Sequence, residues 1–71
     1  MDKLEMLVQY EGFDCEYDFL EEFHIESCVP GICANDNCDY TTFVEPDQDR
    51  GYCEICSTCS VVSGLMLAGL V

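Results

Sequence analysis

Basic side chains are almost absent from this sequence. Lys3 and Arg50 stand against fifteen carboxylates, so the formal net charge is -13 at pH 7. A chain this acidic should repel the phosphates of nucleic acids and anionic membrane surfaces, and it should be attracted to basic protein surfaces. We therefore expect a protein partner with a basic surface, and direct nucleic-acid binding is disfavoured.

Histidine is equally scarce, because His24 is the only one in the chain. A Ser-His-Asp or Cys-His arrangement needs an imidazole beside a nucleophile, and no motif here indicates that pairing. We interpret His24 as a polar surface side chain on a helix. No enzymatic activity is expected.

Long apolar runs are missing as well. The first residues, Met-Asp-Lys-Leu-Glu-Met-Leu, contain no continuous apolar stretch of the kind that a secretory signal requires. The segment after Glu54 is uncharged, but hydroxyl side chains dilute it below the ~20 apolar residues of a membrane span. Both absences favour a cytoplasmic protein without a membrane-spanning segment.

Small size makes a covalent or metal staple necessary. A core built from 71 residues contributes only about 3–5 kcal/mol of net stability, and such chains usually carry disulfides or a metal. Seven cysteines are available for either purpose. In a reducing cytosol clustered thiols more often bind metal, and an odd number fits four ligands plus spare thiols.

Four of the cysteines have the spacing of metal ligands. Four residues separate Cys33 from Cys38, two separate Cys53 from Cys56, and fourteen lie between the pairs. Two short turns of this kind each direct two thiolates at one tetrahedral ion. We predict one structural Zn²⁺ bound by these four side chains. A four-thiolate site is coordinatively closed, so it would not activate water.

Iron is the main alternative to zinc. Rubredoxin-like sites hold iron with the same four thiolates, so the sequence leaves the choice of metal open. In addition, Cys53, Cys56 and Cys59 resemble the start of a ferredoxin cluster motif. Ser63 occupies the position where the fourth cysteine of that motif would fall, so an iron–sulfur cluster would need a distant ligand.

The three remaining cysteines are interpreted as small buried hydrophobes: Cys15, Cys28 and Cys59. Cys28 and Cys59 lie close enough in sequence to a predicted ligand to replace it. Disulfide pairing is a further alternative, which the missing secretion signal disfavours.

An acidic pair of helices is predicted for residues 1–28. The helix over 2–11 begins with Asp2 as cap and a glutamate three residues later, the spacing of a capping box. A second helix over 14–26 has Asp14 as its expected cap. Carboxylates at helical spacing repel one another, so this helix needs packing partners to persist. Together the two should form a helical hairpin.

Residues 29–71 are predicted to form a zinc ribbon. Segment 29–31 (Val-Pro-Gly) breaks any helix and marks the boundary. Residues 40–44 are aromatic or β-branched and indicate a strand, and Tyr52 starts a return strand after a polar turn. We expect these two strands to form a β-hairpin that connects the two cysteine knuckles. Core packing is expected for its aromatic side chains: Tyr40, Phe43 and Tyr52.

The apolar C-terminal segment completes the prediction. Ser60–Val62 should form a short strand beside the hairpin, and Ser63 should cap one or two helical turns that cover the sheet. An apolar end through Val71 must be buried, either in its own fold or in a partner. The expected fold is a small α+β metal-stabilised domain.

Several segments resemble those of a known group of proteins: VPGIC ending at Cys33, CDYTT from Cys38, VEPDQ from Val44, GYCE-x-C from Gly51, and the tail from Val61. They resemble small zinc-ribbon proteins encoded by tailed bacteriophages, which are generally of uncharacterised function. The likeness runs from about Val29 to Val71. It implies the same four cysteine ligands and a viral protein acting in the host cytoplasm.

The expected function is therefore a non-enzymatic binding module. Zinc would fix the ribbon, and the acidic and apolar surfaces would dock on a basic host or phage protein. A virion or assembly component is the alternative, followed by an iron-binding redox protein. The sequence indicates neither the partner's identity nor an oligomeric state.

Overall fold

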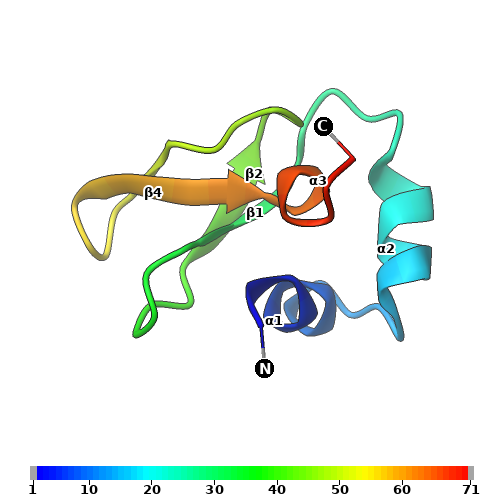
Figure 1. Ribbon diagram of the computed structural model, residues 1–71, viewed down its shortest axis with the longest axis horizontal. Helices are drawn as coiled ribbons and strands as arrows, with labels where there is room; N and C mark the ends of the chain where they lie inside the picture. Colours follow the sequence, from blue (N-terminus) through cyan, green and yellow to red (C-terminus); the bar gives the residue numbers. More distant parts are fainter. Residues whose placement is uncertain (1, 71) are drawn as a thin grey trace.

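The computed structural model describes residues 2–70, so the predictions for Met1 and Val71 lie outside the described part. It shows a small α+β fold with a curled four-stranded antiparallel sheet, and three helices gathered around one end of that sheet (Figure 1). The elements in chain order are α1 (Lys3–Tyr10), α2 (Glu16–Phe23), β1 (Val29–Cys33), β2 (Thr41–Val44), β3 (Gly51–Cys53), β4 (Thr58–Ser63) and α3 (Gly64–Leu67).

Helix α1 has the predicted capping box. The carboxylate of Asp2 accepts the backbone N–H of Glu5 at 2.8 Å, and the Glu5 carboxylate accepts that of Asp2 at 3.4 Å. The helix ends where Gly12 adopts a positive φ of 83°. The next residue, Phe13, donates its N–H back to the Val8 carbonyl at 3.1 Å, which closes a Schellman-type C-terminal turn.

Helix α2 is shorter than predicted, and the proposed cap is wrong. Cys15, not Asp14, is the N-cap residue, and its side chain makes no capping hydrogen bond. Aromatic packing fixes this helix instead. The ring of Phe19 lies 5.6 Å from that of Phe13 and 5.3 Å from that of Phe23, between ring centroids. Figure 1 shows α1 almost end-on and α2 side-on, so their axes cross steeply.

The predicted hairpin between the second and third strands is wrong. The strand order is β2-β1-β4-β3, so β2 and β3 lie at opposite edges of the sheet. The segment interpreted as a helix-breaking boundary forms β1, whose five residues are all buried, and it pairs with both β2 and β4. Its apolar character places it at the centre, and the polar connection over 45–50 crosses from one edge to the other.

The sheet accepts a proline in this central strand because of where the ring nitrogen points. The N–H of Cys33 donates toward the β2 side and that of Ala34 toward the β4 side. Because backbone amides alternate in direction along a strand, the nitrogen of Pro30 also faces the β4 side. Strand β4 ends at Ser63, opposite Gly31. Pro30 therefore removes no hydrogen bond from the ladder.

Two clusters of buried side chains make up the core. The first contains side chains from α1, α2 and β1: Leu4, Leu7, Val8, Phe19 and Ile32. The second surrounds the cysteines on the sheet: Cys33, Cys38, Cys53 and Val61. The first cluster draws on both predicted segments, and the division at residues 28 and 29 stays a prediction.

Helix α3 begins as predicted. The Ser63 hydroxyl accepts the N–H of Met66 at 3.0 Å and donates to the Pro46 carbonyl, which ties the cap to the long β2–β3 connection. Gly64 allows a close helix contact, since a Cβ there would lie 2.6 Å from the Phe19 ring. The apolar C-terminal segment is thus partly buried in the protein's own fold.

Two aromatic residues expected in the core are exposed instead. Phe43 on β2 is 62% exposed and Tyr52 on β3 is 57% exposed. Both lie on short edge strands, where no helix covers the outward face. Tyr40 is half-buried and packs against the cysteine cluster, as predicted. Among the described residues, no helix combines the length and the apolar character that crossing a membrane requires.

Candidate metal centre

The sheet topology brings the two cysteine pairs together. Strands β1 and β3 both pair antiparallel with β4, so they run in the same direction and end at the same side of the sheet. Cys33 is the last residue of β1 and Cys53 the last of β3. Cys38 and Cys56 follow on the two adjacent loops, which meet at the end of the sheet remote from α2 and α3 (Figure 1).

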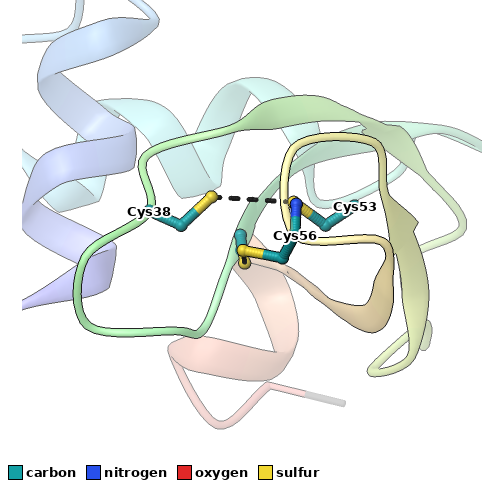
Figure 2. Close-up of side chains that lie close together, drawn as sticks. Cys38, Cys53 and Cys56 are labelled. Atoms are coloured by element: carbon teal, nitrogen blue, oxygen red, sulfur yellow. Dashed lines mark hydrogen bonds between the residues drawn. The ribbon is translucent and has the colours of Figure 1, made fainter.

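The four sulfur atoms form a compact group. All lie within 4.8 Å of one another, and Cys33, Cys38 and Cys53 are buried. The Sγ atoms of Cys38 and Cys53 are 3.6 Å apart, pointing toward each other in Figure 2, and those of Cys33 and Cys56 are 3.9 Å apart. A tetrahedral ion with metal–sulfur bonds of ~2.3 Å needs sulfur separations of about 3.8 Å. The predicted ligands can therefore hold one metal ion.

Hydrogen-bond donors lie beside two of the four sulfurs. The Sγ of Cys53 accepts the backbone N–H of Cys56 at 3.3 Å. The Sγ of Cys33 lies 3.1 Å from the Ser60 hydroxyl, which in turn lies 2.9 Å from the Thr58 hydroxyl. Donors directed at a sulfur stabilise its charged state, the state that binds metal.

Ser60 reaches the cluster through an irregularity in β4. Gly51 pairs with Val61 and Tyr52 pairs with Cys59, so Ser60 is an extra residue opposite this step of β3. Such a bulge redirects side chains relative to a regular strand. Here it accompanies an inward Ser60 and an exposed Cys59.

Two of the clustered thiols have pKa values shifted in opposite directions. Burial opposes ionisation of Cys33, but hydrogen bonds from the Ser60 hydroxyl and the Asn35 backbone outweigh it and lower the pKa of Cys33 to about 7. A backbone hydrogen bond at Tyr40 favours ionisation of Cys38, but burial and the neighbouring thiols outweigh it and raise its pKa to about 12. A metal ion at this site would supply positive charge that favours the thiolate of Cys38.

Lys3 contributes to the centre in a way that the sequence did not reveal. Its ammonium group donates to the backbone carbonyl of Asn35 at 2.6 Å and to that of Cys38. It thereby fastens α1 to the first cysteine loop. The two contacting residues are more than thirty positions apart in the sequence, so no local pattern predicts this contact. The only signal in the sequence is that Lys3 is one of two basic residues.

The spare thiols do not join the cluster. Cys15, Cys28 and Cys59 are all exposed, so their predicted burial is wrong. The first two lie in the segments that flank α2, and the third lies on β4 beside the bulge. Cys28 and Cys59 do not replace any of the four clustered cysteines. The ferredoxin-like arrangement would need Cys59, which lies outside the cluster.

His24 is exposed, as predicted. Its Nδ1 lies 2.7 Å from the backbone carbonyl of Glu21 on α2, a local helix-end contact. The cluster of potential metal ligands contains cysteines and no imidazole. We therefore assign His24 no part in the metal centre.

The arrangement suits a structural ion, because four protein thiolates leave no coordination position for a substrate. Comparisons with protein-family models, curated proteins and solved structures give no match to this chain.

Proposed function

We propose that this chain is a non-enzymatic zinc-ribbon module that docks on a basic protein. The compact group of four sulfurs carries this proposal: it has the separations of a tetrahedral site and uses every ligand position. In this role the ion holds two loops and four strands in place, and recognition belongs to the surface. The resemblance of residues 29–71 to phage-encoded zinc ribbons supports action in the cytoplasm of an infected bacterium.

Zinc is the metal that fits this donor set best. Thiolate ligands in a closed tetrahedron are typical of structural zinc, and iron is the competitor for the same site. Elemental analysis of freshly purified, reduced protein should give one zinc per chain and a colourless solution. Stoichiometric iron with visible absorption would indicate a rubredoxin-like centre and contradict the zinc assignment.

The surface supports a protein partner of opposite charge. The chain carries fifteen carboxylates and two basic residues, and large apolar side chains such as Tyr17 and Leu70 are exposed among them. Electrostatic attraction would speed the encounter, and apolar contacts would hold the complex. Such a complex should weaken as salt increases.

Affinity capture tests this docking role. The metal-loaded protein should enrich a specific basic protein from a host lysate at low salt, and an unrelated protein of similar negative charge should not. Treatment with a chelator should abolish the enrichment, because the scaffold is lost. Capture that is identical for the acidic control would contradict the proposal. Recovery in purified virions instead would indicate an assembly component.

A further inference from the structure

A shallow, largely apolar groove lies between α2 and the C-terminal turn. It encloses about 350 Å³, near the small end of the ~300–1,000 Å³ that ligand pockets span. Its lining residues are Tyr17, Leu20, Glu21, His24 and Leu70. Helix α2 and the chain end lie on the opposite side of the molecule from the two cysteine loops (Figure 1), so the groove is separate from the metal centre.

The chain end holds one wall of this groove in a fixed position. Gly69 adopts a positive φ of 78° and donates its N–H to the Met66 carbonyl at 3.1 Å. Leu70 donates its N–H to the Leu65 carbonyl at 3.0 Å, which completes a Schellman motif after α3. Leu70 is nevertheless 58% exposed. At the equivalent position after α1, Phe13 packs against the first core cluster.

This contrast makes Leu70 unusual. An apolar residue at this position of a Schellman motif normally packs back on the helix that it ends. The backbone of Leu70 makes the hydrogen bond of the motif, but much of its side chain remains exposed to solvent. Tyr17, across the groove on α2, is 72% exposed. The backbone at both positions is held, in α2 at Tyr17 and in the Schellman motif at Leu70, so a partner can contact these side chains without a cost for ordering the backbone.

Carboxylates are concentrated on the helix that forms one wall of the groove, and one of them, Glu21, lines the groove itself. Helix α2 and the turn after it carry five carboxylates: Glu16, Asp18, Glu21, Glu22 and Glu26. The sequence contains no lysine or arginine between Lys3 and Arg50. A second copy of this chain would bring the same charge of -13 and be repelled, and so would a phosphate-rich surface. The complementary occupant is cationic and has apolar side chains.

We infer that this groove binds a basic amphipathic segment of a partner protein. An apolar side chain of the partner inserts between Tyr17 and Leu70, and its lysine or arginine side chains face the carboxylates of α2. This is the helix-in-groove mode of peptide recognition, with carboxylates on the helix that forms one wall. The inference rests on the proposed docking function and assigns that function to one surface.

Two synthetic peptides of equal charge test the apolar part of the contact. The first alternates leucine and lysine at helical spacing, and the second has serine in place of leucine. Titrated into ¹⁵N-labelled, metal-loaded protein, the leucine peptide should bind at least ~10-fold more tightly. Its amide shift changes should centre on α2 and residues 68–70. Equal binding of the two peptides would overturn the inference.

Paired variants locate the site. Tyr17→Ser combined with Leu70→Ser should weaken binding of the leucine peptide at least ~10-fold. Phe43→Ser combined with Tyr52→Ser removes two equally exposed aromatic rings from the sheet and should leave binding unchanged. All four side chains are more than half exposed, so both variants should keep the fold, and circular dichroism checks this.

The two proposals fail in different ways. Shift changes on the sheet, or a loss of binding in the sheet variant, would overturn the groove and leave the docking function intact. The same holds if the Tyr17/Leu70 variant still captures the basic partner from lysate at full strength. If neither the peptide nor any basic protein binds, the docking function itself is wrong.

Discussion

Identical cysteine side chains occupy two very different environments in this protein. Cys33 and Cys53 have no exposed surface and lie within a group of four sulfurs, whereas Cys15, Cys28 and Cys59 face solvent. Spacing in the sequence predicted which four cysteines come together, and they do form one group. It could not reveal the exposure of the second, because exposure depends on the bulge beside Cys59 and on the course of the segments that flank α2 and carry Cys15 and Cys28.

Two serine substitutions, one at a clustered cysteine and one at an exposed cysteine, distinguish the two environments. Cys53→Ser replaces a buried ligand with a hydroxyl that binds zinc poorly at neutral pH. Metal affinity should fall by more than the ~10–100-fold typical of outer-sphere changes, and the fold should loosen. Cys59→Ser should change neither property. Competition with a chromophoric chelator measures both variants; equal losses would contradict the ligand assignment.

The hydroxyl beside Cys33 allows a finer test. Ser60→Ala removes the donor at 3.1 Å from the sulfur but leaves all four ligands in place. The metal should bind about 10-fold more weakly, as for other outer-sphere contacts, while far-ultraviolet circular dichroism stays unchanged. Ser27→Ala, in the exposed loop before β1, is the matched control. Unchanged affinity in the Ser60 variant would show that this hydrogen bond does not tune the site.

Local signals in the sequence predicted single elements well where the cause of the element is itself local. The capping box of α1 and the serine cap of α3 depend on residues three positions apart, and both are present. The strand predicted over 40–44 from its composition is present as β2, one residue shorter, over Thr41–Val44. The start of α2 was misplaced because no side-chain cap marks it: the rings of Phe19 and Phe23 in the helix and Phe13 in the preceding loop pack together instead.

Pairing between strands was less predictable. A polar turn between two β-rich segments usually indicates a hairpin, yet β2 and β3 are the two edges of the sheet. The central strand β1 was not predicted because it contains Pro30 and Gly31, which normally interrupt regular structure. Pro30 is tolerated because β4 ends beside it. Where β4 ends depends on the tertiary fold, so the sequence around Pro30 does not indicate it.

The two candidate helix caps provide a matched pair of substitutions. Asp2→Ala removes the carboxylate that accepts the N–H of Glu5, leaves the backbone N–H of residue 2 free to donate to Glu5, and should lower the free energy of unfolding by about 1 kcal/mol. Asp14→Ala, at the predicted cap that makes no such bond, should change it by less than about 0.5 kcal/mol. Urea unfolding of the metal-loaded protein measures both. A larger loss for Asp14→Ala would reverse the assignment.

The whole molecule depends on a single strand that serves both halves of its interior. Ile32 belongs to the helical cluster and Cys33, the next residue, to the cysteine cluster. Loss of the metal should therefore disturb the helices as well as the loops. With ~10–16 kcal/mol typical for structural zinc, the metal-free chain should be largely unfolded.

Acid should unfold this protein by releasing the metal. In the metal-free protein the pKa of Cys33 is lowered from 9.0 to about 7. Its thiolate therefore stabilises the fold at pH values above 9.0, and this contribution is lost as the pH falls through about 7. Cys38, with a pKa raised to about 12, acts in the opposite sense: its contribution is present below its ordinary value and lost at high pH. Metal binding requires all four thiolates, so protons compete with the ion.

Metal content and circular dichroism should therefore fall together as the pH is lowered from about 8 toward about 5. Re-addition of zinc at the higher pH should restore both signals under reducing conditions. A chain that keeps its helical and sheet signals after the metal has left would contradict this coupling.

Strand β1 also restricts how this chain can change in length. Neighbouring residues of a strand face opposite sides of the sheet. Inserting or deleting one residue within β1 would therefore turn Cys33 toward the helical cluster and Ile32 toward the cysteine cluster. Neither side would then have an acceptable interior. In related sequences, insertions and deletions should be confined to connections such as residues 45–50. The spacing from Val29 to Cys33 should be as invariant as the clustered cysteines themselves.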